Sequence, residues 1–172
     1  MNQSEHVIEK RHANGQVEYE EWRVDGKRHR LDGPAWVRYH DNGQVESEEW
    51  LVDGKRHRLD GPAYVEYHAN GQVAGEYWYV NGLNHRLDGP ARVWYHDNGQ
   101  VAKFWYYEDQ KVTPEFIQQK RLEQAPALAY IDGVKLVEDA DQYYLIFGNE
   151  VIPTSLQDGI DRLEALGVVE YA

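Results

Sequence analysis

The chain has 172 residues, of which 41% are apolar and 13% aromatic, so it has enough apolar side chains to bury a core. Its formal net charge of −12 argues against nonspecific binding to DNA or to an anionic membrane surface, and the absence of cysteine excludes disulfides, thiolate nucleophiles and the commonest zinc sites. The N-terminal sequence MNQSEHVIEKRHANG lacks the apolar run of a secretory signal, and no segment reaches the ~20 apolar residues of a membrane span, so we expect a soluble cytoplasmic protein without a membrane partner.

A 28-residue repeat occupies most of the first 108 residues. The phrase HRLDGPA occurs unaltered three times, at 29–35, 57–63 and 85–91, and Asn-Gly pairs recur at the same interval without insertions. This is the pattern of a repeat array. From Glu108 onward the repeat stops, and the rest of the chain has 13 acidic and 5 basic residues. We therefore predict a β-hairpin array over residues 1–108 and an acidic C-terminal domain or cap over residues 109–172.

Each repeat carries two hairpin signals. Asn-Gly and Asp-Gly between alternating apolar and polar residues, as at Asn42-Gly43 and Asp53-Gly54, are typical of two-residue type I′ turns. The segments around them, AWVRYH and QVESEEWLV, are rich in β-branched and aromatic residues. Two-residue loops at both turns predict five facing pairs, which are Tyr39–Glu46, Val37–Glu48 and Ala35–Trp50 across the first and Trp50–His57 and Glu49–Arg58 across the second.

The second turn of each repeat predicts a tryptophan stacked on a facing histidine. A neighbouring acidic or aromatic residue then faces an arginine, as an ion pair or a cation–π contact. Leu-Asp-Gly-Pro, which follows, ends the strand and turns the chain into the next repeat, so we interpret the repeated phrase as a structural joint. The predicted rungs are Trp22–His29, Trp50–His57 and Trp78–His85, and the arginine pairs beside them are Glu21–Arg30, Glu49–Arg58 and Tyr77–Arg86.

Two motifs in each repeat carry a family resemblance. The first is an aromatic residue before an Asn-Gly hairpin, as in residues 39–43 (YHDNG), and the second is an aromatic residue before another glycine turn, as in residues 50–54 (WLVDG). On these motifs residues 7–108 resemble the MORN-type repeat proteins, in the variant form of the YwqK-like antitoxin family. The resemblance implies an elongated, single-layer array of antiparallel hairpins that associates with a partner protein.

The C-terminal region predicts a small α+β unit that caps the open sheet or docks on it. Thr113 as N-cap and Pro114 at the first helical position predict a helix that ends near Gln124. The pairs Asp132-Gly133 and Gly148-Asn149 suggest two hairpins, the second between strands YYLIF and EVI. A capping box of Thr154 and Gln157 opens a last helix, with one apolar face and a closing glycine, at Leu156, Ile160, Leu163 and Gly167.

Histidine suggests metal binding or acid–base catalysis, but the repeat argues against both. Equivalent residues of adjacent two-strand repeats lie roughly 10 Å apart, so His29, His57 and His85 cannot share one ion. Near-identical copies also lack the asymmetric surroundings that tune a catalytic group. We therefore expect no metal, no cofactor and no enzymatic activity. An enzyme that uses the C-terminal domain is the least favoured alternative.

One face of the predicted array varies between repeats while the other stays constant. Ala35, Val37 and Tyr39 alternate with side chains that point to the opposite face, and the matching positions differ in the next two repeats. Such variation indicates either a recognition surface rich in aromatic residues and arginine or unconstrained surface change. The candidate partner-binding residues are Trp36, Arg38, His40, Tyr64, Glu66, Arg92 and Trp94.

These observations predict a mainly β protein, an elongated single-layer hairpin array with a C-terminal α+β unit. We expect a non-catalytic binding protein that inhibits another protein of basic or mixed surface, as an antitoxin does, in a bacterial or phage conflict system. The alternative is an acidic nucleic-acid mimic. Direct nucleic-acid binding is not expected, because the basic runs KRHR lie beside the acidic runs EYEEW and ESEEW. An unpaired edge strand also offers a route to a homodimer.

Overall fold

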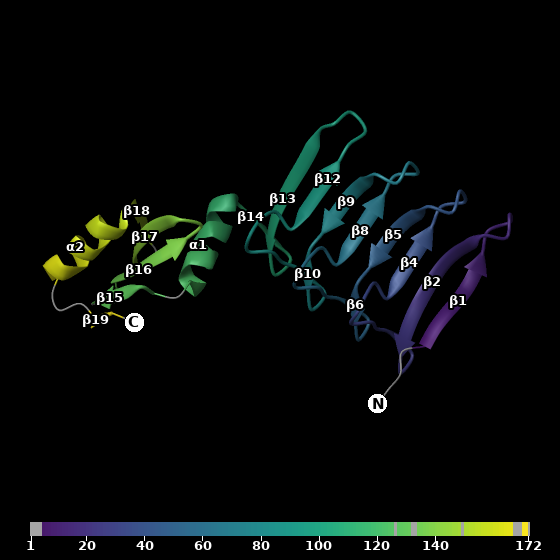
Figure 1. Cartoon of the computed structure of the whole chain (residues 1–172), viewed down its shortest axis with the longest axis horizontal. Coiled ribbons are helices and arrows are strands. Elements are labelled where there is room, and N and C mark those ends of the chain that lie inside the picture. Colours follow the sequence, from purple (N-terminus) through teal and green to yellow (C-terminus); the bar gives the residue numbers. More distant parts are fainter. Residues whose placement is uncertain (1–4, 126, 132–133, 149, 167–169, 172) are drawn as a thin grey trace. The chain divides into compact units, whose positions relative to one another are not determined.

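The computed structural model describes residues 5–125, 127–131, 134–148, 150–166 and 170–171. The fold is mainly β with antiparallel sheets and two helices, as predicted. The chain forms two compact units, Met1–Ile117 and Gln118–Ala172 (Figure 1). The division falls after the expected boundary at residue 108 because a short strand, β14 (Gln110–Val112), pairs with the last strand of the array. No helix among the described residues is long and apolar enough to cross a membrane.

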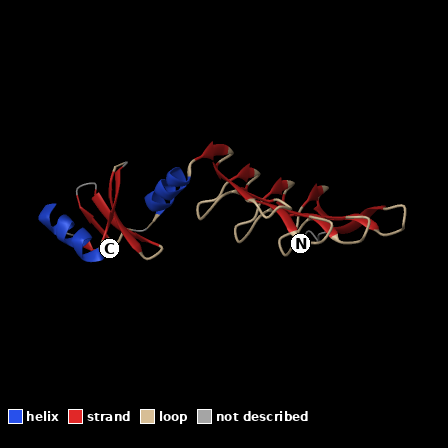
Figure 2. Ribbon diagram, turned by 90° about the horizontal axis from the view of Figure 1, so that it is seen from above, coloured by secondary structure: helices blue, strands red, loops and turns tan. Residues whose placement is uncertain are grey.

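The first unit is built on one ten-stranded antiparallel sheet. Its strands follow the order β1-β2-β4-β5-β8-β9-β12-β13-β14, and β3 pairs with β2. Figure 2 shows the strands as one layer, with connecting loops that project to one side. The strands other than β14 are β1 (Glu5–Arg11), β2 (Val17–Val24), β3 (Lys27–Arg28), β4 (Trp36–Tyr39), β5 (Val45–Glu49), β8 (Tyr64–Tyr67), β9 (Val73–Tyr77), β12 (Arg92–Tyr95) and β13 (Val101–Tyr107).

The second glycine turn, which is Asp-Gly in two repeats and Asn81-Gly82 in the next, has the predicted form. Asp53 and Gly54 have φ angles of 51° and 78°, both positive, as a type I′ turn requires. They join β6 (Leu51–Val52) to β7 (Lys55–Arg56), and the same ribbon recurs as β10 (Tyr79–Val80) and β11 (Leu83–Asn84). Backbone N–H groups of the histidines bond the tryptophan carbonyls as predicted, in the pairs His29–Trp22 (3.0 Å), His57–Trp50 (3.0 Å) and His85–Trp78 (3.2 Å).

The Asn-Gly turn differs from the prediction because its loop has three residues. Only Gly43 has a positive φ, and hydrogen bonds from Gly43 N to His40 O (3.0 Å) and from His40 N to Gln44 O (2.8 Å) close the loop. Tyr39 therefore pairs with Val45, and the predicted Tyr39–Glu46 pair is wrong. The pair Val37–Glu48 is confirmed. The ladder ends at Trp36–Glu49, so the predicted Ala35–Trp50 pair does not form: the Trp50 N–H bonds the Ala63 carbonyl of the next repeat (2.8 Å).

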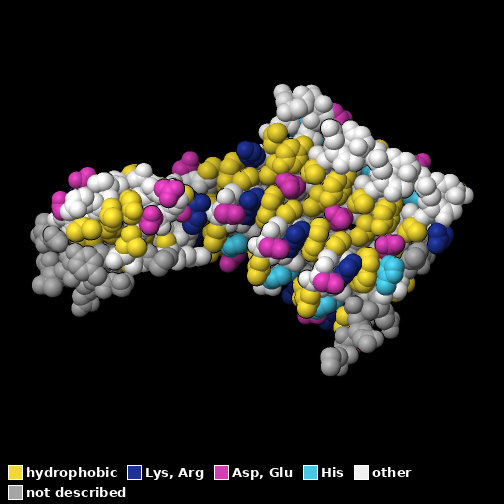
Figure 3. Space-filling model, viewed as in Figure 1, with side chains coloured by type: hydrophobic (Ala, Val, Ile, Leu, Met, Phe, Trp, Pro, Cys, Tyr) yellow, Lys and Arg dark blue, Asp and Glu magenta, His cyan; other side chains and the backbone are white. Residues whose placement is uncertain are grey.

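The constant face of the array supplies its core. Ala35 and Val37 are buried there, and so are the alanine and the valine at the equivalent positions of the next two repeats. Tyrosine hydroxyls on the same face donate to glutamates of the neighbouring strand, as in Tyr67–Glu48 (2.7 Å) and Tyr95–Glu76 (2.7 Å). Figure 3 shows one face of the molecule, on which hydrophobic side chains cover the strands between charged ones. We name this face, with Val37 and Tyr39 and their equivalents, the tyrosine face.

Hydrogen bonds join each repeat to the next. A histidine Nε2 donates to a tyrosine carbonyl one repeat later, as in His12–Tyr39 (2.9 Å) and His40–Tyr67 (3.2 Å). At the other end of the strands, the Gly54 N–H donates to the Arg28 carbonyl (2.9 Å). Because these contacts recur at every step, both ends of each hairpin are fixed to the neighbouring hairpin.

The second unit is a five-stranded antiparallel sheet with a helix on each face. The core against one face contains Leu136, Leu145 and Leu163, and that against the other contains Leu122 and Val137. These cores lie on opposite faces because neighbouring strand residues point in opposite directions. The elements are α1 (Pro114–Gln124), which begins in the first unit, β15 (Ala129–Ile131), β16 (Val134–Asp139), β17 (Gln142–Phe147), β18 (Glu150–Thr154), α2 (Leu156–Leu166) and β19 (Glu170–Tyr171), with strand order β18-β17-β16-β15-β19.

The helix starts test the predicted caps. The Phe116 N–H donates to the Thr113 hydroxyl (3.2 Å), which confirms Thr113 as the cap of α1. The predicted capping box at Thr154 is wrong: Thr154 still pairs with Tyr143 in the sheet, and the Ser155 hydroxyl caps α2 by accepting from the Asp158 N–H (3.0 Å). The predicted turn residues Asp132, Gly133 and Asn149 and the closing Gly167 lie outside the described residues.

Candidate protein-binding surface

The side of the array opposite the tyrosine face carries the predicted partner-binding residues in two rows. The strand pairing places Trp36, Tyr64 and Arg92 in one row across the sheet, and Arg38, Glu66 and Trp94 in the next. The first row also contains Glu49, Tyr77 and Phe104, and the second contains Ser47, Gly75 and Ala102. We name the surface formed by these two rows the aromatic face. Six of the seven predicted residues therefore lie together, although they come from three repeats.

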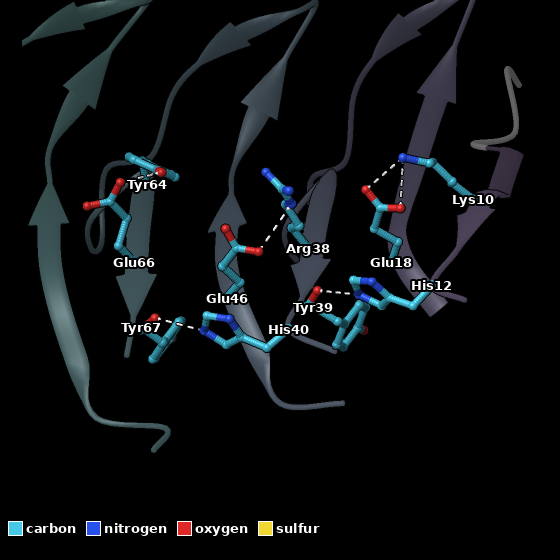
Figure 4. A network of polar contacts seen from close by, with 10 residues as sticks. All are labelled: Lys10, His12, Glu18, Arg38, Tyr39, His40, Glu46, Tyr64, Glu66 and Tyr67. Carbon is cyan, nitrogen blue, oxygen red and sulfur yellow. Dashed lines mark hydrogen bonds and ion pairs between the residues drawn. The ribbon is translucent and has the colours of Figure 1, made fainter. Parts of the chain in front are cut away.

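The seventh predicted residue, His40, has a structural role. It lies where β4 enters the Asn-Gly loop, and its Nε2 donates to the Tyr67 carbonyl of the next repeat (3.2 Å) (Figure 4). His12 and His68 make the same contact in their repeats. The ring nitrogen that would contact a partner is thus already used between repeats.

Ion pairs and hydrogen bonds order the polar side chains of the aromatic face. The bulge after the three-residue loop leaves Glu46 unpaired in the ladder, and its carboxylate lies 3.2 Å from Arg38 (Figure 4). Tyr64 and Tyr77 each donate to one oxygen of Glu66, both at 2.7 Å. Burial and these hydrogen bonds to Glu66 raise the pKa of both tyrosines, so both hydroxyls remain protonated donors at neutral pH.

Arginine side chains pack on the aromatic rings of this face. The Arg28 guanidinium lies 3.4 Å from the ring centre of Trp36, and Arg56 lies 4.2 Å from that of Tyr64. These contacts hold large rings in fixed positions with part of their surface accessible. Trp94 is 38% exposed and the side chain of Arg38 is 48% exposed. Ordered tryptophan, tyrosine and arginine side chains are those that contribute most to protein–protein binding energy.

The predicted rungs on the tyrosine face form with different side-chain partners. Arginine, and not the predicted histidine, lies over each tryptophan: Arg30 over Trp22 (4.2 Å), Arg58 over Trp50 (4.2 Å) and Arg86 over Trp78 (3.9 Å). The histidines are acceptors between repeats, because His29 Nδ1 accepts from Asp53 N (3.2 Å) and His57 Nδ1 from Asn81 N (3.1 Å). The predicted Glu21–Arg30, Glu49–Arg58 and Tyr77–Arg86 pairs are therefore wrong.

Each of the two glutamates binds the arginine two positions earlier than predicted. The Arg28 Nε donates to Glu21 (2.7 Å) and the Arg56 Nε to Glu49 (3.0 Å). The cause is that the chain leaves the ladder after His29, so that Arg30 turns away and its N–H bonds the Leu51 carbonyl of the next repeat (3.1 Å).

Sequence reasoning missed two grooves beside the repeated phrase. One groove of about 380 Å³ lies between the first and second copies of Arg-Leu-Asp-Gly, and Trp50 and Val52 are in its lining. A second groove of about 660 Å³ lies between the next two copies, with Trp78 and Val80 in equivalent places. The sequence feature that could have indicated these grooves is the leucine of HRLDGPA. A loop with only a structural role would bury this side chain.

Neither a metal centre nor a known relative defines the surface. Among the described residues, no group of three or more histidine, aspartate or glutamate side chains has an arrangement that could hold a metal ion. Comparison with family models, with curated proteins and with solved structures finds no match to this chain. The interpretation of the surface therefore depends on its geometry.

The edge strand β1 has features that oppose pairing with another strand. Its sequence EHVIEKR is mostly charged, and its register with β2 shifts twice, after Ile8 and after Lys10. Charged residues and bulges are the devices by which natural sheets prevent edge-to-edge association. The geometry of β1 thus gives no support to the homodimer that the sequence suggested.

Proposed function

We propose that the protein is a non-catalytic binding scaffold that inhibits another protein, in the manner of an antitoxin, in a bacterial or phage conflict system. The observation that carries this proposal is the aromatic face, where Trp36, Tyr64, Arg92 and Trp94 are held in two rows across one sheet. The resemblance of residues 7–108 to MORN-type repeats of the YwqK-like antitoxin family supports it further.

Inhibition by such a surface needs no chemical step. A partner that lies flat on the sheet is blocked sterically, and the net charge of −12 favours a partner with a basic or mixed surface. Ordering of Arg38 by Glu46 and of Glu66 by two tyrosines lowers the entropic cost of binding.

The carboxylates of the sheet favour this function over mimicry of nucleic acid. A mimic presents a run of free negative charges in place of phosphates. Here Glu48 and Glu76 accept hydrogen bonds from tyrosines, and Glu21 and Glu49 bind arginines. Two of these four carboxylates are therefore neutralised by arginine, and the other two are held by tyrosines within the sheet.

An affinity purification from the encoding cell tests the proposal. The tagged full chain is compared with the double variant Arg38→Ala/Trp94→Ala, which changes two exposed side chains of the aromatic face. Lys27→Ala/Val101→Ala, which changes an exposed basic and an exposed apolar residue outside the two rows, is the matched control. We expect the wild type and the control to retain one protein partner that the double variant loses. Recovery of no partner, or equal retention by the double variant, contradicts the proposal.

A further inference from the structure

The grooves of the tyrosine face form a regular series. The three HRLDGP loops, which we name loop ridges, lie at residues 29–34, 57–62 and 85–90, and the two grooves lie between consecutive ridges. The middle ridge, with Arg58, Leu59 and Asp60, is in the lining of both grooves. Figure 3 shows basic, acidic and histidine side chains that recur together along the array.

Each loop ridge turns its positive charge inward and its negative charge outward. The Arg58 guanidinium lies over Trp50 (4.2 Å), and two of its donors are used within the protein, by Asp60 (2.9 Å) and by the Pro62 carbonyl (3.4 Å). The Asp60 side chain is 84% exposed, and the equivalent Asp32 is equally exposed. The bond from arginine lowers the pKa of both aspartates, which therefore remain ionised at neutral pH.

The leucines of the first two ridges contribute little to the core, whereas Leu87 of the third ridge is half-buried. Leu31 and Leu59 are 81% and 80% exposed, although both are large apolar residues. Two apolar side chains presented at equivalent positions, each next to an ordered carboxylate, form a repeated surface that is apolar and acidic at once. A ligand complementary to it combines apolar groups with positive charge.

The period of the series indicates the form of that ligand. Each repeat adds two strands to the sheet, so successive ridges are about 10 Å apart, twice the strand spacing of ~4.8 Å. A peptide in the extended polyproline II conformation advances about 3.1 Å per residue with three residues per turn, so every third side chain points to the same side and meets the next ridge. We propose that the loop ridges and their grooves form a binding site for an extended basic peptide segment with lysine or arginine at every third position and apolar residues between.

This site does not depend on the proposed function. It lies on the tyrosine face, whereas the proposed inhibitory surface is the aromatic face on the other side of the same sheet. Variants of the two faces therefore separate the failure of one proposal from the failure of the other.

Fluorescence anisotropy with synthetic peptides and the full chain tests the site. One labelled probe has lysines at positions 1, 4 and 7 with leucine and alanine between, and a second probe of the same composition has its three lysines adjacent. We expect the first probe to bind more tightly, with an affinity that falls as salt increases. Asp60→Asn should weaken it about two- to fivefold, as the loss of one exposed ion pair does, and the triple variant Asp32→Asn/Asp60→Asn/Asp88→Asn should weaken it at least about tenfold.

Two further variants complete the test. Leu59→Ser should also weaken binding of the first probe, while Asp41→Asn removes the same charge from an exposed turn outside the grooves and should leave the affinity unchanged. Circular dichroism should show the same fold for every variant, because Asp60 and Leu59 are almost fully exposed.

Four results with the peptide probes would overturn the proposal. They are equal affinity for the two probes, no binding of either probe, unchanged affinity in the triple aspartate variant, and loss of binding in Arg38→Ala/Trp94→Ala while the triple variant still binds. A concentration-dependent dimer that the triple variant abolishes would also overturn it, since a second copy of the chain would then occupy the grooves.

Discussion

The first repeat contains a buried ion pair whose removal should cost more than removal of its equivalent in the second repeat. Glu21 is fully buried, and Arg28 and Arg23 contact its carboxylate. In the equivalent pair, Glu49 is 17% exposed and binds Arg56 at 3.0 Å. The perturbation is Arg28→Met, compared with Arg56→Met. Methionine keeps much of the length of the side chain and its packing on the neighbouring ring while removing the charge.

The burial of the glutamate sets the difference. A hydrogen bond to a buried charged group contributes about 1.5–3 kcal/mol, whereas a partly exposed pair contributes about 0–1 kcal/mol. Because Arg23 still contacts Glu21, the full cost of an uncompensated buried charge does not arise. Arg28→Met also loses a close cation–π contact with Trp36 (3.4 Å), whereas Arg56→Met loses longer ones with Tyr64 (4.2 Å) and Tyr79 (5.3 Å). We therefore expect Arg28→Met to lower the free energy of unfolding by about 1–2 kcal/mol more than Arg56→Met.

Urea denaturation followed by tryptophan fluorescence measures this difference, since every repeat contains tryptophan. The slope of the transition should stay constant between variants, so that the midpoints compare stabilities directly. Equal losses in the two variants, or a larger loss for Arg56→Met, would show that burial of the carboxylate does not control the strength of this pair.

Two further predictions concern the tyrosine face and the second unit. Burial and the hydrogen bond to Glu48 raise the pKa of Tyr67 above its ordinary value of 10.0. The protonated hydroxyl therefore adds to the free energy of unfolding in full below pH 10, and this contribution is lost as the pH rises through the raised pKa. Urea midpoints of Tyr67→Phe between about pH 9 and 12 should therefore fall less steeply than those of the wild type; parallel curves would refute this. In α2, a Cβ at Gly159 would lie 2.6 Å from Cδ1 of the buried Leu136, so Gly159→Ala should cost about 1–2 kcal/mol despite the gain of ~1 kcal/mol in helix propensity. A urea midpoint above that of the wild type, or a cost that Leu136→Val in the same chain does not reduce, would count against that clash.

The two glycine turns of the repeat show how far local sequence determines structure. At Asp53-Gly54 both residues adopt positive φ, so the two-residue loop and its register follow from residue types alone. At Asn42-Gly43 the same reasoning fails because Asn42 bonds elsewhere: its side chain accepts from the Gln44 N–H (2.9 Å) and donates to the Ala69 carbonyl of the next repeat (3.0 Å). The loop at Asn98 has the same form with the equivalent local bond, from the Gln100 N–H to the Asn98 side chain (3.0 Å), so this local asparagine bond accompanies the longer loop in both repeats.

Turns without glycine were harder to predict. Glu108-Asp109 and Ala140-Asp141 adopt positive φ at both positions, which residues other than glycine, asparagine and aspartate rarely do. The first of these is fixed by an earlier repeat, because the Asp109 carboxylate accepts from the side chain and the backbone N–H of Asn84, both at 2.7 Å. The sequence places Asn84 where the other repeats have arginine, but nothing local links it to a turn that follows later.

The candidate site was predictable in its location and not in its detail. Alternation along β4, β8 and β12 is enough to place Trp36, Tyr64 and Arg92 on one face. The grooves of the opposite face depend on how successive loops pack, and on Arg58 covering Trp50 in place of histidine. Such contacts between repeats depend on three-dimensional packing.

The bonds between successive hairpins have a consequence for how the array unfolds and how it changes length. Since Gly54 bonds Arg28 and Gly82 bonds Arg56 in the same way, each hairpin is supported only by its immediate neighbours. Loss of structure should then spread inward from the terminal hairpin, and a chain with one whole 28-residue unit removed or added should keep every remaining interface. Gene duplication or deletion in steps of one unit thus offers a simple route to longer or shorter binding surfaces.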